Sequence, residues 1–134
     1  MSTPQPDEAE ADIVEIYAPA DVVYVSTLRL TAASLAARCD LTVDDIEDLR
    51  LAVDEACALL LPHASASSTL DARFEVGVGS LRVHASVATT SASEVDRDGF
   101  AWTVLGALAS SVDVRADDGR LTISVTKKRE VAPK

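Results

Sequence analysis

The stretch DLRLAVDEACALLLPHA, residues 48–64, carries apolar side chains at helical spacing. At about 100° per residue, these side chains fall on one stripe, which is typical of a helix that packs against a sheet. Thr42 precedes the pattern as an N-cap residue with acids in the first turn, and Pro62 follows its end. The sequence therefore predicts a central helix over residues 42–61, whose sheet-facing stripe comprises Ile46, Leu49, Val53, Ala56, Cys57 and Leu60.

The opposite side of this helix carries a carboxylate between two leucines. Leu51, Glu55 and Leu59 follow one another one turn apart, so they form a second, partly apolar face. Two interpretations are open. Either a neighbouring helix or loop covers the leucines and leaves Glu55 at the rim, or this face lines a former ligand cavity.

Length and composition predict one small domain with a core. The chain has 134 residues, of which 48% are hydrophobic. No apolar run approaches the roughly 20 residues that a membrane span needs, and the start MSTPQPDEAEAD does not resemble a signal peptide. We therefore expect a cytoplasmic protein that does not contact the membrane.

Charge and cysteines narrow the class of partner. Twelve Lys and Arg against 22 Asp and Glu give a net charge of -10, which disfavours direct binding to nucleic acid. This acidity suits contact with a basic protein surface, although it also suits solubility alone. Cys39 and Cys57 belong to no CxxC or Cys/His cluster, so we expect reduced, buried thiols and no metal site.

The remaining patterns predict an α+β fold, a two-layer sandwich with three main helices on one face of a mixed sheet. One domain is expected over residues 12–128, between a disordered tail (1–11) and a frayed end (129–134). Its other elements are strands at 13–17, 69–78 and 81–88, helices at 21–38 and 100–109, and a last hairpin between 112 and 125.

The element order and three stretches resemble the anti-sigma factors and serine kinases of the GHKL, or histidine kinase-like ATPase, fold. The stretches are RLTAAS (29–34), LRLAVDEACALLLPHA (49–64) and DGFAWTVLGALASSVDV (98–114). The likeness covers residues 13–127 and is greatest to the actinobacterial, mycobacterial-type anti-sigma factors. It implies a Bergerat-like sandwich and a role in partner switching.

In active kinases of that family, a glutamate of this helix activates the attacking hydroxyl, and an asparagine four residues later helps to hold magnesium. Glu55 matches the glutamate, whereas Leu59 takes the place of the asparagine and offers no oxygen ligand. The first glycine box is missing, and the last is reduced to Gly99-Phe100-Ala101. We interpret Glu55 as a vestigial base, and Glu55 and Gly99 as remnants of a nucleotide site.

Arg29 matches the arginine with which the resembling anti-sigma factors contact sigma; the alternative is a solvated arginine with a packed stem. The resemblance implies an anti-sigma factor that sequesters an alternative sigma factor from RNA polymerase and is released by an anti-anti-sigma antagonist. We expect a homodimer without cofactor or metal. The alternatives are an active serine/threonine kinase that phosphorylates the antagonist with ATP and magnesium, and a nucleotide-binding sensor without catalysis.

Overall fold

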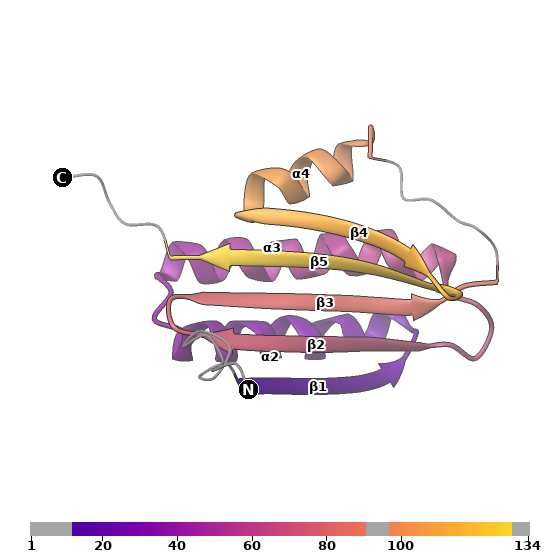
Figure 1. Cartoon of the computed structure of the whole chain (residues 1–134), viewed down its shortest axis with the longest axis horizontal. Helices are drawn as coiled ribbons and strands as arrows, with labels where there is room; N and C mark the ends of the chain where they lie inside the picture. Colours follow the sequence, from indigo (N-terminus) through magenta and orange to yellow (C-terminus); the bar gives the residue numbers. More distant parts are fainter. Residues whose placement is uncertain (1–11, 91–96, 130–134) are drawn as a thin grey trace, which may run out of the picture.

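The computed structural model describes residues 12–90 and 97–129. The predicted tail over 1–11 and nearly all of the predicted frayed end lie outside these residues. The strands form one sheet, and the helices lie together on one of its faces (Figure 1). The elements are β1 (Asp12–Pro19), the 3-10 helix η1 (Val22–Tyr24), α2 (Val25–Arg38), α3 (Val43–Leu60), the 3-10 helix η2 (Leu61–His63), β2 (Thr69–Gly77), β3 (Ser80–Ala88), α4 (Phe100–Leu108), β4 (Ser111–Asp117) and β5 (Arg120–Lys128).

The sheet has the order β1-β2-β3-β5-β4, and every neighbouring pair is antiparallel. The α+β class and the three helices are as predicted, but the mixed sheet is wrong for the described residues. Strands β3 and β4 do run in the same direction around α4. They do not pair, however, because β5 lies between them and is antiparallel to both.

Helix α3 packs its apolar stripe on the sheet, as predicted. Leu49, Val53, Cys57 and Leu60 are each at most 1% exposed, while Ile46 at the start of the stripe is only partly buried. In the three inner strands, β2, β3 and β5, every second residue packs toward the helices. The polar residues between them point to the other face of the sheet. The core therefore lies entirely between the helices and one face of the sheet.

The ends of α3 follow from local sequence. The Thr42 side chain accepts a hydrogen bond from the Asp45 backbone N–H (3.1 Å), and the Asp45 carboxylate accepts one from the Thr42 N–H (3.2 Å). This reciprocal pair is a capping box with aspartate in place of the usual glutamate. Pro62 lies in η2, directly after the last helical turn.

A buried lysine joins three elements at one end of the core. Lys127 of β5 is 4% exposed, and its ammonium donates to the Asp48 carboxylate of α3 (3.3 Å) and to the Leu108 carbonyl of α4 (3.0 Å). A buried ammonium needs such partners because its desolvation is costly. Lys127 therefore fixes the end of α4 against α3.

Helix α4 is almost wholly apolar. Helical spacing in its sequence predicts that Phe100, Val104 and Leu108 share one buried stripe, but the structure differs. Leu105 is the fully buried residue, whereas Phe100 is 84% exposed. None of the described helices is long and apolar enough to span a bilayer.

Two leucines of α3 provide a matched test of this packing. Leu49→Ala opens a cavity in the core and should lower the free energy of unfolding by about 3 kcal/mol. Leu51→Ala removes the same atoms from a side chain that is 51% exposed. This substitution should change the free energy of unfolding by less than about 0.5 kcal/mol. Urea unfolding of both variants measures the difference, and equal losses would contradict the described orientation of α3.

Candidate functional site

Helix α3 lies between α2 and α4 in the helical layer (Figure 1). Because its apolar stripe faces the sheet, the residues on its other side face away from the core. The sequence placed Glu55 on that side, with one leucine a turn before it and another a turn after it. The candidate site is therefore built on the outer face of α3 and on the neighbouring parts of α2 and α4.

Glu55 is half-buried and makes no hydrogen bond or ion pair with any described residue. Leu51, one turn earlier, is exposed to 51%, so nothing in the described part of the chain covers it. Leu59, one turn later, is half-buried and packs against the core. The interpretation in which neighbours cover both leucines therefore holds only for Leu59.

The donor set beside Glu55 does not fit a magnesium ion. Magnesium requires oxygen ligands in near-octahedral geometry, and the isobutyl group of Leu59 supplies none. Within residues 12–90 and 97–129, no three acidic, histidine or cysteine side chains gather into a possible metal site. Glu55 thus lacks the neighbouring oxygen ligand that the family resemblance implies, and its role as a base stays a prediction.

Gly99 forms the N-cap of α4, and its carbonyl accepts a hydrogen bond from the Thr103 N–H (3.3 Å). Its φ of −78° is ordinary extended backbone, so this turn does not itself require glycine. Close by, the guanidinium of Arg97 lies 5.7 Å from the centre of the Trp102 ring. The loop that precedes this turn lies partly outside the described residues, and nucleotide contact by Gly99 stays a prediction.

Arg29 is held, half-buried, at the junction of α2 and α3 by an ion pair that the sequence did not predict. Its Nη1 donates to both carboxylate oxygens of Asp54, at 3.1 and 3.0 Å, and the two side chains are 32% and 29% exposed. Its Nε is buried and has no hydrogen-bond partner among the described residues. The pair joins α2 to α3 directly beside Glu55, and at this exposure it stabilises the fold by no more than about 1 kcal/mol.

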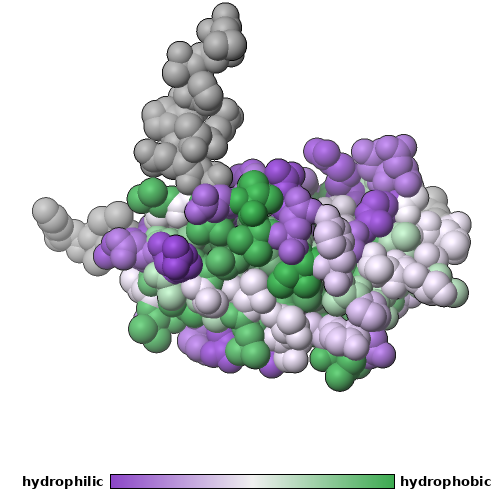
Figure 2. All heavy atoms as spheres, turned by 90° about the horizontal axis from the view of Figure 1, so that it is seen from below, coloured by the Kyte–Doolittle hydropathy of each residue, from purple (hydrophilic) through white to green (hydrophobic). Residues whose placement is uncertain are grey.

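The outer side of the helical layer also exposes large apolar side chains. Figure 2 views the molecule from the β1 and α2 side, where apolar groups stand among polar ones. Such a mixture of apolar and charged groups is typical of surfaces that bind proteins. Besides Phe100 of α4, the most exposed apolar residues of this layer are Val22, Val23, Leu30, Val43 and Leu51.

Cys57 lies behind this surface, within the core. Burial, with a smaller contribution from the charge of Asp54, raises the pKa of its thiol to about 12. Burial also raises the pKa of Cys39. Both are free thiols, as expected, and both remain protonated near neutral pH, so neither is a nucleophile of the site.

The sequence did not single out a polar network on the other face of the sheet. His84 of β3 lies between Glu75 and Ser124, at 2.5 and 2.6 Å. The signal was the alternation of polar residues along β2, β3 and β5, but strand register was needed to bring them together.

Comparison with known proteins gives one consistent family. Residues 18–127 match the model of the histidine kinase-like ATPase domain. The serine-protein kinase RsbW of Bacillus licheniformis is 30% identical over 87% of this chain and 86% of its own length. RsbW of Bacillus subtilis (strain 168) is 46% identical over 40% of this chain and 34% of its own length.

A solved structure of RsbU and RsbW domains from Mycobacterium tuberculosis has the same fold. It superimposes with a TM-score of 0.64 and 18% identity, and covers 92% of this chain but only 35% of that longer chain. The match supports the predicted sandwich. The expected closeness to actinobacterial members stays a prediction.

Proposed function

The chain belongs to the histidine kinase-like ATPase domain family, and we propose that it acts as an anti-sigma factor. In this role it binds an alternative sigma factor in the cytoplasm, keeps it from RNA polymerase, and releases it when an anti-anti-sigma antagonist binds. The observation that carries the proposal is Arg29, which Asp54 holds, one-third exposed, at the junction of α2 and α3, next to the exposed Leu30.

Electrostatics supports a protein partner rather than DNA. The net charge of -10 repels nucleic acid phosphates, and acids gather at the start of α3, where Asp44 and Glu47 are exposed. Sigma factors carry basic, DNA-reading surfaces, which an acidic partner approaches quickly through electrostatic steering. Arg29 supplies a positive charge within this acidic surface. When sigma binds, the Arg29–Asp54 ion pair breaks, and the guanidinium pairs with a carboxylate of the partner.

Replacing Arg29 tests this surface. Arg29→Ala should weaken sigma binding at least tenfold, because loss of a central interface arginine typically costs about 2 kcal/mol or more. The dimer should persist, and the free energy of unfolding should fall by at most about 1 kcal/mol. Titration of the purified sigma factor by calorimetry measures the first effect, and urea unfolding measures the last.

Asp54→Ala is the matched control, because it breaks the same ion pair but keeps the guanidinium. It should bind sigma at least as tightly as the wild type, since Arg29 is then free for the partner. If both variants lose binding equally, the ion pair acts only by holding α2 on α3. If the wild type binds no sigma factor of its own cell in a pull-down, the anti-sigma proposal is wrong.

Serine kinase activity is the second candidate. Relatives that match over most of their length are named serine-protein kinases, and the resemblance implies that Glu55 matches the base of the active members. Against it stand Leu59 and the degraded glycine boxes, because phosphoryl transfer depends on positioned phosphates and metal. We therefore propose that ATP turnover is absent or feeble in this chain.

A phosphorylation assay separates the two candidates. With radiolabelled ATP and magnesium, the wild-type protein should transfer little or no phosphate to its antagonist. Leu59→Asn should not restore transfer, because the glycine boxes remain degraded. Efficient transfer by the wild type that Glu55→Ala abolishes would show instead that the chain is a kinase.

A homodimer completes the proposal. Strand β1 is at the edge of the sheet, and Ile13 and Tyr17 are 43% and 67% exposed. An open edge with apolar side chains is a template for pairing with another chain. We propose that two copies associate through β1.

Sedimentation velocity at micromolar concentration should show a dimer. Ile13→Lys should shift it to monomer, because charged side chains block pairing at a sheet edge. Val78→Lys adds the same charge at a turn residue that is 85% exposed, and should leave the dimer intact. A wild-type monomer, or a dimer unaffected by Ile13→Lys, would count against pairing through β1.

A further inference from the structure

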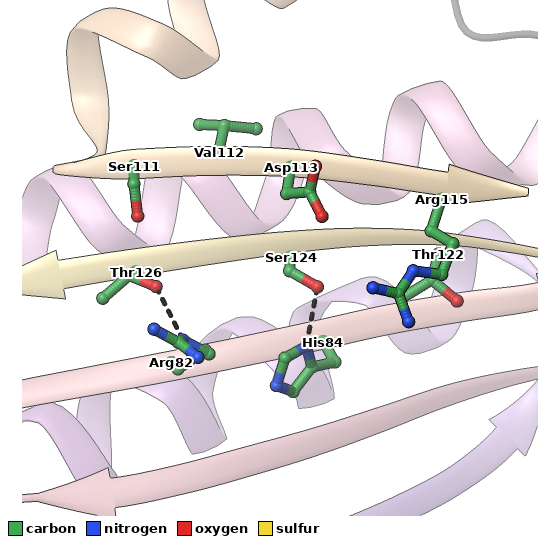
Figure 3. A pocket seen from close by; sticks show the side chains of 9 residues that line it. All are labelled: Arg82, His84, Ser111, Val112, Asp113, Arg115, Thr122, Ser124 and Thr126. Atoms are coloured by element: carbon green, nitrogen blue, oxygen red, sulfur yellow. Dashed lines mark hydrogen bonds between the residues drawn. The ribbon is translucent and has the colours of Figure 1, made fainter.

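The face of the sheet that no described helix covers has its own hollow. Its volume is about 400 Å³, and it lies over β3, β5 and β4 (Figure 3). Polar side chains line it because every second residue of these strands points away from the core. Its polar and charged lining consists of Arg82, His84, Ser111, Asp113, Arg115, Thr122, Ser124 and Thr126.

Two arginines of this hollow form no ion pair with a carboxylate of the described residues, although Arg82 lies opposite Glu75 of β2 and its charge lowers the pKa of that carboxyl. Arg82 uses its Nε to donate to the Thr126 hydroxyl (3.0 Å), which leaves its terminal nitrogens available. Arg115 makes no hydrogen bond or ion pair within the described part of the chain. By contrast, Arg29, Arg50 and Arg120 each pair with a carboxylate. In so acidic a protein, cations without such partners are available for an anion from outside.

The floor of the hollow is fixed by a hydrogen-bonded chain across three strands. The imidazole of His84 bonds to Glu75 through Nε2 (2.5 Å) and to Ser124 through Nδ1 (2.6 Å). Burial alone would raise the pKa of Glu75, but the His84 hydrogen bond and nearby positive charges outweigh it and lower that pKa. Glu75 thus remains an ionised acceptor for His84. Arg82 is one of the positive charges that lower its pKa, and Arg115 is not.

The donors around the hollow suit a phosphate better than a carboxylate. Two guanidinium groups stand on either side of His84, and the hydroxyls of Ser111 and Thr122 have no other hydrogen-bond partner in the described residues (Figure 3). A carboxylate accepts through two oxygens, whereas a phosphate monoester accepts through three and carries up to two charges. Guanidinium groups are the side chains best matched to phosphate geometry.

Asp113 is the carboxylate in the lining, and it limits the class of ligand. It repels an isolated anion, but it accepts a hydrogen bond from a hydroxyl or amine on the rest of a larger ligand. We propose that this hollow binds a small phosphate monoester that also carries a hydroxyl group, with Arg82 and Arg115 holding the phosphate. This site lies on the opposite face of the sheet from Glu55, and it does not depend on the anti-sigma role.

Calorimetric titration with glycerol 3-phosphate, in phosphate-free buffer at constant ionic strength, tests the proposal. Arg82→Gln and Arg115→Gln should each weaken binding about tenfold, because a hydrogen bond to a charged group contributes about 1.5 kcal/mol or more. Arg38→Gln is the matched control: it removes the same charge from α2, where Arg38 is exposed and has no ion pair with a described residue. It should bind like the wild type. Circular dichroism checks that all three variants fold.

Further experiments identify the class of ligand and define the results that would overturn the proposal. Asp113→Ala should favour inorganic phosphate relative to glycerol 3-phosphate, because it removes the repulsion for both ligands but removes the acceptor for the alcohol hydroxyl only from the ester. Flotation with phosphatidylcholine vesicles that contain lysophosphatidic acid, whose glycerol keeps a free hydroxyl, would assign the phosphate to a lipid headgroup if it depends on Arg115; its absence assigns the phosphate to a soluble ester. No saturable binding by the wild type, or equal weakening in all three arginine variants, overturns the proposal. The proposal is also overturned if Arg82→Gln changes the protein from a dimer to a monomer while the wild type binds no phosphate, because Arg82 then serves the dimer.

Discussion

The burial of one side of α3 against the sheet is the constraint on which the other features depend. Leu49, Val53 and Leu60 fill the space above β3 and β5, so the opposite side of the helix must face outward. That rotation places Glu55 and Asp54 at the surface together, and brings Asp54 within reach of Arg29 on α2. Because all the apolar burial lies on one face of the sheet, the other face is free to carry charge.

Local sequence predicted the elements well where a local signal exists. The helix expected over 42–61 occupies 43–60, because a capping box starts it and Pro62 follows it. The direction of pairing has no such signal: alternation identifies a strand but not its neighbour, and β5 inserts between β3 and β4. In α4, nearly every residue is apolar, so periodicity could not distinguish the buried Leu105 from the exposed Phe100.

The site was predictable in part, and for a similar reason. The position of Glu55 on the outer face of α3 follows from the 3.6-residue period alone. The pairing of Arg29 with Asp54 depends on how α2 packs against α3, which joins residues 25 positions apart. His84 meets Ser124 because β3 and β5 pair in that register, a relation between strands 40 positions apart. Interactions across such separations in the sequence depend on the assembled fold, so local sequence patterns cannot predict them.

The strand register also places the start of β1 and the end of β5 close together in the sheet. Asp12 pairs with Val76, Val76 with Leu81, and Leu81 with Lys127, so the first and last strands begin and end in one row of the sheet. Three strand spacings separate these ends, or about 14 Å. Linkers on both sides would leave from the same end of the sheet. The fold can therefore be inserted between two other domains without a linker that runs along the strands. The helical surface around Arg29 would stay clear of both junctions.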